Sequence, residues 1–132
     1  MSINEVMLPQ TAVPVSREVD VVVVGGGASG IASAISAAKG GARTLLIEQR
    51  GFLGGMGTVS LVPAFCPFTD KVKPIVRGIG MELMERMKLA CNAEYREAYA
   101  NTLDWVPIDP ETLKRVYDDA ALEAGVELLF HT

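Results

Sequence analysis

Three glycines follow a run of four valines in the pattern Gly25-x-Gly27-x-x-Gly30. Gly25 allows a tight turn out of a strand, and Gly27 lacks a Cβ, so the backbone there can approach a pyrophosphate closely. Gly30 lets the following helix pack tightly. The free N–H groups that begin this helix, at Ala28 and Ser29, favour a bound anion. The motif predicts a loop that binds a dinucleotide.

An acidic residue, Glu48, ends the second apolar run, residues 44–47. A carboxylate at the tip of a second strand can accept hydrogen bonds from both hydroxyls of an adenosine ribose. It also disfavours NADP, whose 2′-phosphate would meet a like charge, so NAD and FAD remain. The alternative is a βαβ unit without ligand. Its glycines would serve only turns and packing, Ser29 would cap the helix, and Glu48 would merely end a strand.

A second glycine pair follows in RGFLGGMGT, residues 50–58, as Gly54-Gly55. With these motifs the chain resembles, from about Val19 to Thr132, the FAD-dependent oxidoreductases with glutathione-reductase-like FAD domains. In that family a glycine doublet follows the strand-end acid and approaches the flavin side of the cofactor. The resemblance implies an FAD cofactor and a Rossmann-like domain.

The resemblance also implies a role for each matching position. The glycine motif would face the pyrophosphate, the acid would hold the adenosine ribose, and the next two residues would lie near the adenine rim. The second glycine pair and the methionine after it would follow the pyrophosphate and ribityl chain. The expected cofactor-binding residues are Gly25, Gly27, Ala28, Ser29, Gly30, Glu48, Gln49, Arg50, Gly54, Gly55 and Met56.

The elements around these motifs predict an α/β fold with a parallel sheet and flanking helices. The consecutive valines predict a strand that is buried on both faces, followed by a helix from Ala28 to about Lys39. A strand over residues 44–47 comes next. Asp109 is a good N-cap for a later helix that ends at Gly125. We expect the last strand, residues 126–130, to lie parallel beside residues 44–47, in the order 3-2-1.

The middle of the chain gives weaker signals. Two prolines bar residues 59–68 from a regular helix and from a central strand. Residues 80–92 have the spacing of an amphipathic helix, with an apolar stripe. Residues 94–107 are expected to form an excursion that ends in a turn. The stripe consists of Ile79, Leu83, Met84, Met87, Ala90 and Cys91.

Two parts are expected along the 132 residues: an extended arm over residues 1–17 and the N-terminal part of an FAD-binding domain over residues 18–132. The family also needs a substrate domain and a C-terminal FAD segment, and the sequence stops at an apolar strand. We therefore interpret the chain as truncated, or alternatively as a small subunit that a partner chain completes. A sheet edge with unpaired backbone groups favours association with another copy or a completing chain.

Composition excludes several functions. The net charge of −4 argues against nucleic acid. No stretch has the apolar length of a membrane span or the form of a signal peptide. Two distant cysteines, Cys66 and Cys91, indicate reduced thiols in a cytoplasmic protein, and the presence of one histidine argues against a metal site.

The predicted function is FAD-dependent oxidation or reduction of an unidentified small molecule, with the flavin carrying the electrons. No catalytic residue is assigned. Cys66 is a candidate redox partner, although a buried structural cysteine is the commoner case. An NAD-dependent dehydrogenase domain is one rival, which leaves Gly54-Gly55 unexplained. A non-catalytic nucleotide-binding or assembly module is the other.

Overall fold

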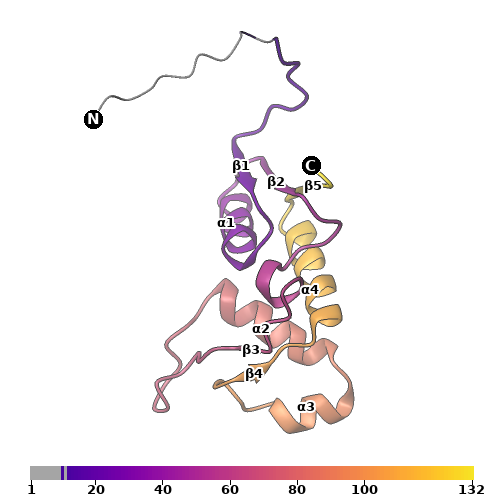
Figure 1. Cartoon of the computed structure of the whole chain (residues 1–132). Coiled ribbons are helices and arrows are strands. Elements are labelled where there is room, and N and C mark those ends of the chain that lie inside the picture. The colour runs from indigo at the N-terminus through magenta and orange to yellow at the C-terminus, as the bar shows by residue number, and fades with distance from the viewer. Residues whose placement is uncertain (1–9, 11) are drawn as a thin grey trace, which may run out of the picture.

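A three-stranded parallel sheet forms one end of the molecule in the computed structural model, which describes residue 10 and residues 12–132 (Figure 1). Its strands are β1 (Val21–Val24), β2 (Thr44–Glu48) and β5 (Glu127–Phe130), in the order β1-β2-β5. In this register Val22 pairs with Leu45, and Leu46 pairs with Leu128. The predicted parallel fold and 3-2-1 strand order are confirmed.

The prediction that β1 is buried on both faces is wrong. Its burial alternates along the strand, and the side chains of Val22 and Val24 are 52% and 80% exposed. A strand that packs on one face only shows this period of two. Among the described residues, helices pack on one face of the sheet, which leaves the two outward-facing valines uncovered.

Two helices connect the strands of the parallel sheet. Helix α1 (Ala28–Lys39) lies between β1 and β2 and packs on both, while α4 (Pro110–Glu123) leads into β5. Gly40 and Gly41 end α1, and Gly41 has a φ of 91° that favours glycine. Both helices begin at the edge where the parallel strands end, so their N-termini lie near the glycine motif.

The N-terminus of α4 is capped as predicted. The Asp109 carboxylate accepts a hydrogen bond from the backbone N–H of Thr112 at 2.7 Å, and Pro110 occupies the first helical position. One face of α4 carries a stripe of buried residues, which packs against α1 and α2 (Ile79–Ala90). Gly125 ends the helix with a φ of 84°. The members of this stripe are Thr112, Leu113, Val116, Tyr117, Ala120 and Ala121.

The region between β2 and α4 forms the other end of the molecule (Figure 1). It contains η1 (Gly55–Gly57), a two-stranded antiparallel sheet of β3 (Ala64–Phe65) and β4 (Val106–Pro107), and the helices α2 and α3 (Ala93–Tyr99). As expected from its prolines, the segment before α2 has no regular helix and supplies only the short β3. In the excursion predicted for residues 94–107, α3 occupies the first half and β4 forms the end.

The apolar stripe predicted for α2 is correct in part. Leu83, Met84 and Met87 are buried, but Ala90 is exposed and Lys88 is 3% exposed. The ammonium group of Lys88 donates a hydrogen bond to Glu85 at 2.9 Å, and this partner permits its burial.

The N-terminal arm predicted for residues 1–17 lies mostly outside the described residues. Residues 12–17 have no regular secondary structure, and Arg17 forms an ion pair with Glu127 of β5 at 3.0 Å. In the described part of the chain, no helix combines the length and apolar character that crossing a membrane requires.

Candidate functional site: a cleft between two glycine loops

The first glycine loop joins β1 to α1 with little side-chain bulk. Gly25 has a φ of 99°, and its N–H donates to the Ile47 carbonyl at 2.8 Å, extending the β1–β2 pairing. Gly27 is the N-cap of α1 and makes no side-chain cap hydrogen bond. Ser29 therefore lies inside the helix and is not its cap. The first N–H groups of α1 remain free to bind an anion.

Gly30 has a packing role that only glycine can fill. A Cβ added to Gly30 would lie 1.8 Å from the carbonyl oxygen of Gly25. Helix α1 thus contacts the turn that precedes it too closely for any side chain. The contact fixes the direction in which the N-terminus of α1 points.

The second glycine loop packs directly on the first. The N–H of Gly54 donates to the carbonyl of Gly26 at 2.8 Å. A Cβ added to Gly55 would lie 2.9 Å from the Cα of Gly27. Two segments far apart in the sequence therefore meet backbone to backbone, and the structure explains why both are rich in glycine.

A cleft of about 700 Å³ opens between these loops and the β3–β4 end of the molecule. One end is lined by Val24, Gly25 and residues 27–30 and 54–57, which offer backbone and few side chains. The other end is apolar. Of the residues that line it, the sequence made only Cys66 a candidate, because strand and helix periodicity reports burial but not which cavity a residue faces. They are Val62, Ala64, Phe65, Cys66, Phe68, Ile108, Leu113 and Tyr117.

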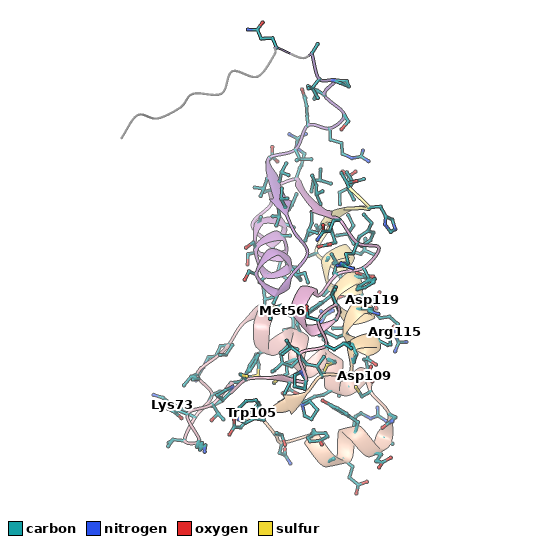
Figure 2. The ribbon with its side chains drawn as sticks, in the orientation of Figure 1. Met56, Lys73, Trp105, Asp109, Arg115 and Asp119 are labelled. Carbon is teal, nitrogen blue, oxygen red and sulfur yellow. The ribbon has the colours of Figure 1, made fainter. Side chains whose placement is uncertain are left out.

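Met56 lies at this cleft, between α1 and α4 (Figure 2). Its side chain is 69% exposed, although its apolar character would suit a buried core. An exposed methionine at the edge of a cleft is available to contact a ligand.

Glu48 ends β2 with its side chain 8% exposed. One carboxylate oxygen accepts a hydrogen bond from the N–H of Gly26 at 2.7 Å, and the other accepts one from the N–H of Arg50 at 2.8 Å. The carboxylate therefore ties the first glycine loop to the segment after β2. This structural role was not foreseen from the sequence.

Gln49 and Arg50 line a separate cavity of about 350 Å³, together with Gly51, Phe52 and His131. The imidazole of His131 lies against Gly51, where an added Cβ would be 2.9 Å from the ring. The N–H of His131 also donates to the Arg50 carbonyl at 3.3 Å. The structure thus brings the end of β5 beside the end of β2, and the predicted residues fall into two neighbouring cavities.

The two cysteines are free thiols in different surroundings. The expectation that Cys66 is buried is wrong, since it is exposed and lines the cleft after β3. Burial raises the pKa of the Cys91 thiol. Within the described residues, no three side chains of His, Cys, Asp or Glu come together as metal ligands would.

Comparison with known proteins extends the likeness beyond these motifs. The model of the family described as FAD dependent oxidoreductase matches residues 20–132. Glutathione reductase of Schizosaccharomyces pombe is 37% identical over 93 residues, which cover 70% of this chain and 18% of that enzyme. Dihydrolipoyl dehydrogenase of Trypanosoma brucei brucei is 52% identical over 42 residues, 32% of this chain and 9% of that enzyme. The chain spans less than a fifth of the length of these relatives.

Solved structures share the fold at low sequence identity. THI4 of Thermovibrio ammonificans aligns with a TM-score of 0.52 and 21% identity, covering 85% of this chain and 38% of that one. The 3-ketosteroid-delta4-(5alpha)-dehydrogenase of Rhodococcus jostii RHA1 aligns with a TM-score of 0.53 and 17% identity, covering 92% and 39%. At such identities the likeness concerns the fold alone.

Proposed function

The chain belongs to the FAD dependent oxidoreductase family, and from this membership we propose that residues 18–132 hold FAD in the cleft between the two glycine loops. The cofactor of this family is FAD. The observation that carries the proposal is the close packing of Gly55 on Gly27 at the N-terminus of α1. With FAD bound, the protein would transfer electrons to or from an unidentified small-molecule substrate.

The shape of the glycine loops supports this placement. A Cβ added to Gly27 would meet no atom within 4 Å, so the space in front of this residue is open. The same space lies at the free N–H groups of α1, which suit a pyrophosphate. Protein packing leaves room for a side chain at this position, so the glycine there is explained if a ligand approaches the backbone closely. We therefore assign Gly25, Gly27 and the first turn of α1 to the pyrophosphate.

Glu48 suits the adenosine ribose even with its two existing hydrogen bonds. An ionised carboxylate offers about four acceptor positions, and the N–H groups of Gly26 and Arg50 take two of them. The remaining positions can accept the two ribose hydroxyls. The backbone bonds would hold the carboxylate in place before the cofactor binds, which reduces the entropy lost on binding.

The cavity beside Glu48 supports the assignment of Gln49 and Arg50 to the adenine rim. Gly54, Gly55 and Met56 line the cleft and are assigned to the pyrophosphate and ribityl portion. When bound, FAD supplies the acceptor for hydride or electrons. The described residues bind and orient it, and the apolar end of the cleft keeps water away from the ring.

Two free cysteines support a reducing, cytoplasmic setting. The exposed Val22 and Val24 support association of this sheet face with further protein, either another segment or another copy. The net charge of −4 favours neither nucleic acid nor an anionic membrane as a partner.

The experiment that tests the proposal is a visible absorption spectrum of the purified chain, followed by mass analysis of any released cofactor. Chain without colour is then titrated with FAD and, separately, with NAD. We expect FAD to bind with quenching of its fluorescence and NAD to bind far more weakly. Preference for NAD would favour the dehydrogenase rival, and binding of neither would contradict the cofactor assignment.

A further inference from the structure

Tyr117 is a polar residue in an otherwise apolar part of the cleft. It lies on the buried face of α4 with only 3% of its side chain exposed. Its neighbours on this face include Leu113 and Ala121, which are fully buried. Tyr117 also lines the cleft together with Gly30 and Gly57. A leucine would fill the same face of α4 without bringing a hydroxyl into this space.

The hydroxyl of Tyr117 forms no hydrogen bond with another described residue and is open to the cleft, since the only buried side-chain atom without a partner in the described part of the chain belongs to Asp118. Tyrosine hydroxyls in largely buried positions usually find a hydrogen-bond partner. Tyr95 shows the usual case, since its hydroxyl donates to the carbonyl of Pro107. Desolvation raises the pKa of Tyr117 to about 12, so the phenol keeps its proton at neutral pH and can donate.

The two ends of the cleft restrict what this hydroxyl could meet. The glycine end suits phosphates, and the end near Phe65 and Phe68 suits an apolar ring. Tyr117 lines the same cavity, and its hydroxyl differs both from the backbone N–H groups of the glycine end and from the apolar side chains of the other end. A chain of hydroxyls that connects a phosphate to a ring would satisfy a group that can both donate and accept.

We propose that the Tyr117 hydroxyl forms a hydrogen bond with the ribityl chain of bound FAD. The inference rests on the proposed function and adds a cofactor-contacting residue that lies outside both glycine loops. It predicts that Tyr117 contributes to the affinity for FAD but not to the affinity for ADP, which has the adenosine and pyrophosphate but lacks the ribityl chain and the ring.

The test is the Tyr117→Phe variant of the full chain, titrated with FAD and with ADP by calorimetry, with the melting temperature measured without ligand. We expect about three- to tenfold weaker FAD binding, the loss of one neutral hydrogen bond, and unchanged ADP binding. The melting temperature should stay level or rise, because the removed hydroxyl has no protein partner. Tyr95→Phe is the matched control and should lower the melting temperature while leaving the affinity for FAD unchanged.

Three results would overturn the inference. Unchanged FAD affinity in Tyr117→Phe would mean that the hydroxyl does not contact the cofactor. Equal weakening of FAD and ADP would place its effect on the adenosine or phosphate side, or on the fold. If the native chain binds ADP and FAD equally well, the ribityl chain contributes nothing to recognition. Failure of the native chain to bind either ligand would instead contradict the proposed function, on which the Tyr117 contact rests.

Discussion

The N–H of Gly26 donates a 2.7 Å hydrogen bond to the carboxylate of Glu48, tying the middle of the first glycine loop to the tip of the neighbouring strand. The second oxygen of the same carboxylate holds the N–H of Arg50. Glu48 therefore has a structural task that is complete without a ligand. An acidic residue assigned to cofactor binding from its position can also be required for the loop that binds the cofactor.

Glu48→Gln should therefore destabilise the free chain as well as weaken FAD binding. Glutamine can accept only one of the two backbone hydrogen bonds, so one buried N–H loses its partner at a cost of about 1–3 kcal/mol. The free energy of unfolding from urea titration, with and without FAD, separates the two effects. Glu97→Gln, at an exposed position on α3, is the control. A variant as stable as the native chain would show that the backbone bonds contribute little.

Gly27 and Gly30 form a matched pair for distinguishing ligand binding from folding. Gly27 has a φ of −73° and a ψ of 178°, which alanine adopts readily, and its Cβ would meet no protein atom. Gly27→Ala should fold normally but bind FAD about tenfold more weakly or worse, because the methyl group enters the space proposed for the pyrophosphate. Fluorescence titration measures this loss. Native affinity in Gly27→Ala would place the cofactor elsewhere.

Gly30→Ala should fail in the opposite way. The added Cβ would lie 1.8 Å from the Gly25 carbonyl oxygen, so α1 or the turn must move. Overpacking of this kind costs about 3 kcal/mol or more. Thermal unfolding without ligand measures the cost directly. A native melting temperature would show that the turn has more freedom than its close contact with α1 suggests.

Asp118 gives stability an unusual dependence on pH. One of its carboxylate oxygens is buried without a partner among the described residues, and burial raises the pKa of this carboxyl against the opposing effect of the Leu53 backbone. The folded state therefore binds the proton more tightly than the unfolded state does. Between the ordinary aspartate pKa of about 4 and the raised value, this group lowers stability as pH increases.

Asp118→Asn should accordingly raise the melting temperature at neutral pH, and the gain should shrink as the pH falls towards 4. Thermal unfolding across this pH range measures the effect. Glu97→Gln, at an exposed position on α3, provides the control, because the charge of Asp119 beside Asp118 contributes to the raised pKa and makes that neighbour unsuitable. A constant difference at every pH would show that the substitution acts through packing and not through the charge.

The sequence predicted the elements that follow local rules. Gly40 and Gly41 end α1, Asp109 caps α4, and the three parallel strands lie in the expected order. The first glycine loop was proposed for the site from its own motif, whereas the second was proposed from the family resemblance. These features depend on residues close in the chain or on general rules of connection.

The features that the sequence did not predict depend on contacts between distant segments. Val22 and Val24 are exposed because no described residue covers their face of the sheet, which no local pattern reports. Lys88 is buried beside the apolar residues of α2, where Glu85 pairs with its ammonium group. Tyr117 lies on the buried face of α4, and only the packing of this helix against α1 and α2 shows that it reaches the cleft.

The two cysteines provide a test of where FAD binds that needs no substitution. Cys66 is exposed and lines the cleft, whereas Cys91 is partly buried and burial raises its thiol pKa. Because the thiolate is the reactive form, iodoacetamide at neutral pH should modify Cys66 first and Cys91 slowly. FAD should slow modification of Cys66 by covering the cleft and leave the rate at Cys91 unchanged. Mass spectrometry of peptides over time measures both rates in one sample. Equal labelling of Cys66 with and without saturating FAD would place the bound cofactor away from the apolar end of the cleft.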